Sequence, residues 1–132
     1  MATSQGVDTK PLSPHVQIWK WHWTMAASIS HRVSGCALYV GTVLLAAWII
    51  SAATGPEAYA LVEAFMLSWF GRLVLFGFTA AVTYHFANGI RHLIWDGPGL
   101  AFSPGAASFV SFLNFLFAIA VTIGIWLFAY YV

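Results

Sequence analysis

The run Val33–Ala53 contains no charged residue and is long enough to cross a lipid bilayer as one helix. A helix spans the hydrocarbon core, which is about 30 Å thick, with roughly 20 mostly apolar residues. Two more such runs follow, so we expect three spans, at about residues 24–53, 70–93 and 105–131. Charged residues make up 7% of the chain, against about 25% in soluble domains. The sequence therefore predicts an all-α membrane protein, with three transmembrane helices in a single domain behind a polar N-terminal segment, residues 1–20.

Turn-forming residues separate the expected spans. The segment Thr54–Glu57 ends the first span and Asp96–Gly99 ends the second, because glycine and proline favour turns. Ser103 followed by Pro104 is typical of a helix start. The sequence allows two interpretations of the mildly amphipathic stretch 57–68. Either it lies at the membrane interface, or it prolongs the second helix.

The composition also excludes several kinds of protein. The single cysteine, Cys36, rules out an intrachain disulfide, a covalent haem attachment motif and a four-cysteine iron–sulfur site. The net charge of +1 gives no sign of nucleic-acid binding, and the chain has neither a P-loop nor a Gly-x-Gly-x-x-Gly motif. If the chain belongs to an enzyme, the catalytic domains are therefore expected in other subunits, and no activity is expected of this chain alone.

Basic residues predict the orientation in the membrane. Lys10, Lys20 and Arg32 lie at the start of the first span, and Arg91 lies at the end of the second, which returns to the same side. The positive-inside rule places that side, and with it the N-terminus, in the cytoplasm. Because residues 1–20 do not resemble an Arg-rich presequence, we expect the bacterial cytoplasmic (inner) membrane rather than the mitochondrial inner membrane.

Four side chains at the start of the first span form one helical stripe. Trp21, Met25, Ser28 and Arg32 are separated by four, three and four residues, so they share a face. An aromatic plane, a thioether and two hydrogen-bond donors suit a quinone headgroup, whose carbonyls are acceptors. The alternative is that Ser28 bonds to its own helix and Arg32 reaches the lipid phosphates.

A second group lies on one face of the second span. His85, Gly89 and His92 are separated by four and three residues, with His85 about 10 Å deeper than His92. A neutral imidazole in a helix bundle is a natural axial ligand of haem iron, and Gly89 would leave room for the macrocycle. No second histidine lies at that depth, so a two-histidine site would need a partner chain. The alternatives are a histidine bonded to a neighbouring helix and one step of a proton path.

Three segments, in this order, resemble signatures of the family of succinate dehydrogenase cytochrome b subunits, the larger of two membrane anchors. They are Lys10-Pro-Leu-Ser-Pro-His15, then Ser28-Ile-Ser-His-Arg-Val-Ser-Gly35, then His85 followed by Gly89-Ile-Arg-His-Leu-Ile-Trp-Asp96. The resemblance covers residues 10 to about 100, with a third span of suitable length. Lys10 replaces the arginine that is usual in the family.

This resemblance implies a haem b site. His85 would be the axial ligand from this chain, and a second, small membrane-anchor subunit would supply the other ligand and complete the helical bundle. His31, Arg32 and His92 would contact the haem propionates.

The resemblance also implies a ubiquinone site on the first span. Ser28 would donate a hydrogen bond to a quinone carbonyl, and Arg32 would stabilise negative charge on the quinone as it is reduced. The pocket would be lined by Trp21, Met25 and Ile29.

The implied complex oxidises succinate and reduces quinone. Electrons would pass from a flavoprotein subunit through an iron–sulfur subunit to the quinone, while this chain binds and orients the groups that react. Three alternatives stay open: the anchor of a quinol:fumarate reductase, a proton-conducting or transport subunit without haem, and a purely structural anchor.

Overall fold

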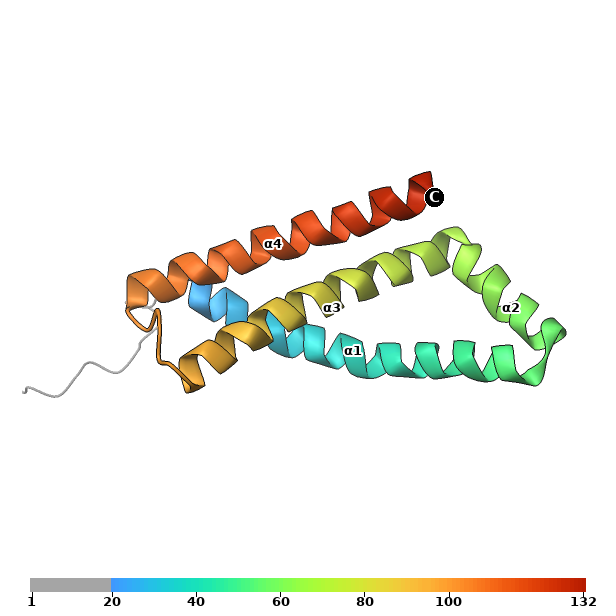
Figure 1. Cartoon of the computed structure of the whole chain (residues 1–132), viewed down its shortest axis with the longest axis horizontal. Helices are drawn as coiled ribbons and strands as arrows, with labels where there is room; N and C mark the ends of the chain where they lie inside the picture. Colours follow the sequence, from blue (N-terminus) through green and yellow to red (C-terminus); the bar gives the residue numbers. More distant parts are fainter. Residues whose placement is uncertain (1–19) are drawn as a thin grey trace, which may run out of the picture.

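The computed structural model describes residues 20–132, and within that range the chain is built from helices alone (Figure 1). The expectations for residues 1–19, which include Lys10 and the segment up to His15, lie outside the described residues. Four helices follow one another: α1 (Trp23–Thr54), α2 (Pro56–Leu67), α3 (Trp69–Asp96) and α4 (Pro104–Tyr131).

Three of the four helices, α1, α3 and α4, are long and apolar enough to cross a membrane. They contain 32, 28 and 28 residues, and at 1.5 Å per residue each is more than about 40 Å long. Because lipid offers the backbone no hydrogen-bond partners, a long apolar segment satisfies its own amide groups by forming a helix. The predicted all-α architecture with three membrane-spanning helices is confirmed.

The short helix α2 is separate from α3. It begins after Gly55, which has a φ of 140° that glycine tolerates best, and Pro56 occupies its first turn. It ends at Ser68, whose side chain accepts a hydrogen bond of 3.0 Å from the backbone nitrogen of Gly71. Any side chain at Gly71 would collide with the backbone of Phe65, so this glycine permits the close α2–α3 corner.

The central helix is α3, which packs against both α1 and α4, while α1 also contacts α4. Figure 1 shows the start of α1, the end of α3 and the start of α4 at one end of the molecule, which we call the polar end. At the opposite end, α2 bridges the separated ends of α1 and α3 (Figure 1). Residues of the first two spans that are far apart in sequence therefore meet at the polar end.

Small and polar side chains fill the contacts between the helices, and large apolar side chains face outward. Since lipid is as apolar as leucine, membrane helices gain more from close backbone approach and interhelical hydrogen bonds than from burying leucine. One such bond runs from the hydroxyl of Tyr84 in α3 to the carbonyl of Ala27 in α1, at 3.0 Å. Another runs from Nε1 of Trp126 in α4 to the hydroxyl of Thr79, at 3.3 Å.

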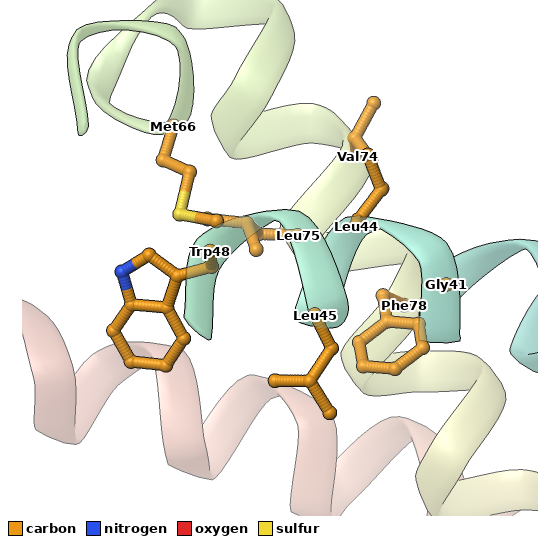
Figure 2. Close-up of a pocket in the computed structure, with 8 residues that line it drawn as sticks. All are labelled: Gly41, Leu44, Leu45, Trp48, Met66, Val74, Leu75 and Phe78. Carbon is orange, nitrogen blue, oxygen red and sulfur yellow. The ribbon is translucent and has the colours of Figure 1, made fainter. Parts of the chain in front are cut away.

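A cavity of about 340 Å³ lies between α1, α2 and α3, away from the polar end (Figure 2). Its walls are apolar side chains, among them Leu44, Trp48 and Met66. The ring of Phe78 lies over Gly41, where a β-carbon would collide with it. This cavity has no titratable side chain, whereas the histidines of the membrane-spanning helices lie at the polar end.

Candidate functional site

Three histidines from two helices form a cluster at the polar end. The ring of His31 in α1 stacks on the ring of His85 in α3, with centroids 4.1 Å apart and planes inclined by 20°. The centroid of His92 lies 5.3 Å from that of His31, and its ring meets Trp95 edge-on at 5.5 Å. All three histidines are half-buried. The packing of α1 on α3 therefore brings together residues that are more than fifty positions apart.

A hydrogen-bonded chain orients the ring of His85. The hydroxyl of Ser34 donates to the carbonyl oxygen of His31 at 2.9 Å, and its oxygen lies 3.2 Å from Nδ1 of His85. Because the only proton of the hydroxyl is already used, this oxygen accepts from Nδ1. We therefore assign the hydrogen of the neutral imidazole to Nδ1, which leaves a free lone pair on Nε2.

A glycine allows the ring of His85 to approach α1 this closely. A β-carbon at Gly35 would lie 3.2 Å from Cε1 of His85, which is tighter than ordinary contact. At Gly89, by contrast, a β-carbon would meet no atom of residues 20–132 within 4 Å. The role expected of Gly89, which is to leave room for a macrocycle, stays a prediction. Gly35, on the opposing helix, provides the close approach to the imidazole.

The histidine cluster fits a haem. Ligating histidines usually donate the other ring N–H to a nearby acceptor, as His85 does to Ser34. The His85 ring forms no other hydrogen bond within residues 20–132, so its Nε2 is available to a metal. In addition, Nε2 of His31 is buried and has no partner in the described part of the chain. Such an orphaned atom suits a polar group supplied from outside, such as a propionate oxygen.

The predicted quinone stripe lies on the first turns of α1 and just before it. Met25 and Ser28 are half-buried, whereas Trp21, Ile29 and Arg32 are exposed. The stripe is thus assembled by the periodicity of one helix rather than by contacts between helices. It presents a partly open face on which a ligand would be covered by another subunit.

Ser28 differs from most hydroxyl residues in these helices. Ser34, Ser51 and Ser111, for example, donate to backbone carbonyls three or four residues earlier. The hydroxyl of Ser28 forms no hydrogen bond within the described range, so the interpretation in which it bonds to its own helix is not what the structure shows. Its donor is free to act on a ligand.

The buried environment of Arg91 is not predicted from the sequence, where this residue marks the cytoplasmic side and belongs to one of the family signatures. In the structure Arg32 is exposed, whereas Arg91 is 4% exposed and donates from Nη1 to the hydroxyl of Ser111 in α4. The available signal was the spacing of Tyr84, Asn88 and Arg91 by four and three residues, which places three polar side chains on one face.

Comparisons with known proteins give a consistent result. The family model described as "Succinate dehydrogenase/Fumarate reductase transmembrane subunit" matches residues 7–127. The succinate dehydrogenase cytochrome b556 subunit of Paracoccus denitrificans is 40% identical over 92 residues, which cover 69% of this chain and 71% of that protein. The b556 subunit of Rickettsia typhi is 32% identical over 117 residues, covering 89% and 90%. The mitochondrial b560 subunit of Sus scrofa is 40% identical over 97 residues, covering 69% and 56%.

Proposed function

This chain belongs to the succinate dehydrogenase/fumarate reductase transmembrane subunit family, and from that premise we propose that it anchors a succinate dehydrogenase in the membrane, holds haem b through His85 and forms part of the ubiquinone reduction site. The observation that carries the haem assignment is the hydrogen bond from Nδ1 of His85 to Ser34, which leaves Nε2 free for iron. The relatives are named as cytochrome b subunits, which agrees with a haem.

In the proposed haem site His85 would hold the haem from this chain, and the second, small anchor subunit would supply the other ligand. Haem b, when bound, takes up and releases single electrons. Ser34 holds the His85 ring in the ligating tautomer. His31, Arg32 and His92 would donate hydrogen bonds to the haem propionates, and the orphaned Nε2 of His31 supports this arrangement.

In the proposed quinone site Ser28 donates its hydroxyl proton to one carbonyl of ubiquinone, and Arg32 provides a positive charge close by. Trp21, Met25 and Ile29 form apolar walls that exclude water. In such surroundings the hydrogen bond from Ser28 and the charge of Arg32 act more strongly on the quinone than they would in solvent. The free hydroxyl of Ser28 and the exposed guanidinium of Arg32 support these roles.

The partners follow from the same premise. The flavoprotein oxidises succinate, and the iron–sulfur subunit passes the electrons to the quinone. The iron–sulfur subunit therefore covers the exposed face of α1 that carries Arg32. The chain lies in the bacterial cytoplasmic membrane with its N-terminus in the cytoplasm. The basic residues at the polar end, Lys20 among them, support this orientation through the positive-inside rule.

A second candidate is the anchor of a quinol:fumarate reductase. The description of the matching family names both enzymes, and the two reactions are opposite directions of the same chemistry. The measurement that separates them is the ratio of succinate oxidation to fumarate reduction in the purified complex, with a quinone and a quinol respectively.

The haem assignment is tested by the reduced-minus-oxidised visible spectrum of the purified complex. We expect a b-type spectrum in the wild type that disappears in His85→Leu. His22→Gln is the matched control, because His22 lies at the same end of the molecule but before α1, hydrogen-bonded to Thr24. A haem spectrum that survives in His85→Leu would refute the ligand assignment. A wild-type complex whose difference spectrum lacks the b-type haem bands would favour the non-haem proton-conducting alternative.

A further inference from the structure

We propose that Arg91, a buried positive charge without a carboxylate partner in residues 20–132, raises the reduction potential of the haem held at His85. This inference rests on the proposed function, because it assumes a haem at that histidine. Arg91 acts here as a positioning and tuning residue that contacts neither the iron nor the quinone.

Arg91 is a buried residue. Its side chain is 4% exposed and lies where α3 packs on α4. Nη1 donates to the hydroxyl of Ser111, and the guanidinium carbon lies 4.3 Å from the centre of the Trp95 ring. Nε is buried and has no hydrogen-bond partner within residues 20–132. Within residues 20–132 this cation therefore has one hydrogen-bond acceptor, and its buried Nε has none.

No carboxylate in the described part of the chain compensates the charge of Arg91. The acidic residues there are Glu57 and Glu63 in α2, at the opposite end of the molecule, and Asp96 at the end of α3, all three of them exposed. No ion pair between Arg91 and any of them forms within residues 20–132. A neutral hydroxyl and an aromatic face replace the usual partner.

A buried charge of this kind exerts an electric field on the groups around it. A buried ion without a partner is unfavourable, so an arginine at this position needs a reason beyond helix packing. Away from water its field is weakly screened and reaches further than that of a surface charge. Arg91 follows His85 by six residues on α3, about 9 Å along the helix axis. The Trp95 ring that its guanidinium contacts also meets His92, whose ring centroid lies 5.3 Å from that of His31.

The sign of the effect follows from charge balance. Reduction of ferric to ferrous haem adds one electron and so makes the group less positive by one unit. A fixed positive charge nearby therefore stabilises the reduced form relative to the oxidised form. Removing the charge of Arg91, or pairing it with a carboxylate, lowers the reduction potential of the haem.

The competing explanation is that Arg91 only ties α3 to α4 through Ser111, and the chain offers variants that separate the two. Arg91→Gln removes the charge, while Arg91→Lys retains it. Ser111→Ala removes the tie but leaves the charge. Ser111→Asp keeps Arg91 and neutralises it from the opposite helix, which also covers the case in which Arg91→Gln fails to assemble. Arg72→Gln removes an exposed arginine from the opposite end of α3 and is the distance control.

The measurement is a redox titration of the haem, followed by its visible spectrum, in the complete complex carrying each variant. We expect lower potentials in Arg91→Gln and Ser111→Asp, and potentials close to that of the wild type in Arg91→Lys, Ser111→Ala and Arg72→Gln. Equal shifts in Ser111→Ala and Arg91→Gln, or no shift in either Arg91→Gln or Ser111→Asp, would overturn the inference. A haem that persists in His85→Leu would instead refute the proposed function.

Discussion

The hydroxyl oxygen of Ser34 lies 3.2 Å from Nδ1 of His85 and links the first and third helices beside the stacked ring of His31. Because this hydroxyl donates to the carbonyl of His31, it receives the imidazole proton. One side chain of α1 thus decides which nitrogen of a histidine in α3 carries the hydrogen. The proposed haem site depends on this relationship, and the first prediction tests it.

Replacing Ser34 with alanine should lower the haem content of the complex. Without the acceptor, the ring of His85 can rotate and protonate Nε2, which then cannot bind iron. Loss of the partner of a ligating histidine typically weakens metal binding about 10- to 100-fold. Ser34→Thr keeps the hydroxyl and should retain haem. The measurement is haem per complex after purification, and equal content in the alanine and threonine variants would contradict the prediction.

The two glycines near the histidines should respond differently to alanine. At Gly35 the added β-carbon would lie 3.2 Å from Cε1 of His85, so the ring must shift and haem binding should weaken. At Gly89 the added β-carbon meets nothing within 4 Å in residues 20–132, so Gly89→Ala should leave the packing of this chain unchanged, and any loss of haem there would come from the macrocycle that this space is expected to receive. Haem content, the position of the haem absorption bands and the unfolding temperature report these effects. The prediction fails if Gly35→Ala leaves both the haem content and the absorption bands unchanged.

Ser28→Ala should impair quinone reduction while leaving succinate oxidation by an artificial acceptor intact. The variant lacks the free hydroxyl donor proposed to hold a quinone carbonyl. A hydrogen bond contributes about 1 kcal/mol, so kcat/KM for ubiquinone should fall about 5-fold. Ser30→Ala, a half-buried serine two residues further along α1, is the matched control. Normal quinone kinetics in Ser28→Ala would remove this residue from the site.

Arg32→Leu should reduce quinone turnover more strongly than Ser28→Ala, because it removes both a charge and several donors. Arg32→Lys keeps the charge and should retain part of the activity, although lysine lacks the planar fork of the guanidinium. Steady-state rates with ubiquinone and with an artificial acceptor separate the quinone step from succinate oxidation. Equal activity of the leucine and lysine variants would show that the positive charge is not used.

The contact between Gly41 of α1 and Phe78 of α3 gives a prediction about stability alone. Gly41→Ala would force the ring of Phe78 to move, because a β-carbon at this position collides with it. Such overpacking costs about 1–3 kcal/mol, so the complex should unfold at a lower temperature. Gly77→Ala is the control, since its β-carbon would meet nothing within 4 Å in the described chain. Haem content should stay normal in both, because neither glycine is near the histidines.

The sequence alone determined the fold class and the order of the elements. Apolar runs of the right length predict membrane helices because a lipid-embedded backbone has no other way to satisfy its amide groups. Turn residues such as Gly55 and Gly97 marked where the first two spans end. The helical period also placed Met25, Ser28 and Arg32 on one stripe of α1, because that relation lies within a single helix.

Only the tertiary structure decided which faces meet. The period of a helix relates its own side chains but says nothing about how the helix is rotated against its neighbours. In a membrane the hydropathy pattern is a weak guide to this rotation, because lipid and protein interior are both apolar. For this reason Arg91 and Arg32, alike in the sequence, differ in burial, and Gly35 on the opposing helix receives the ring of His85.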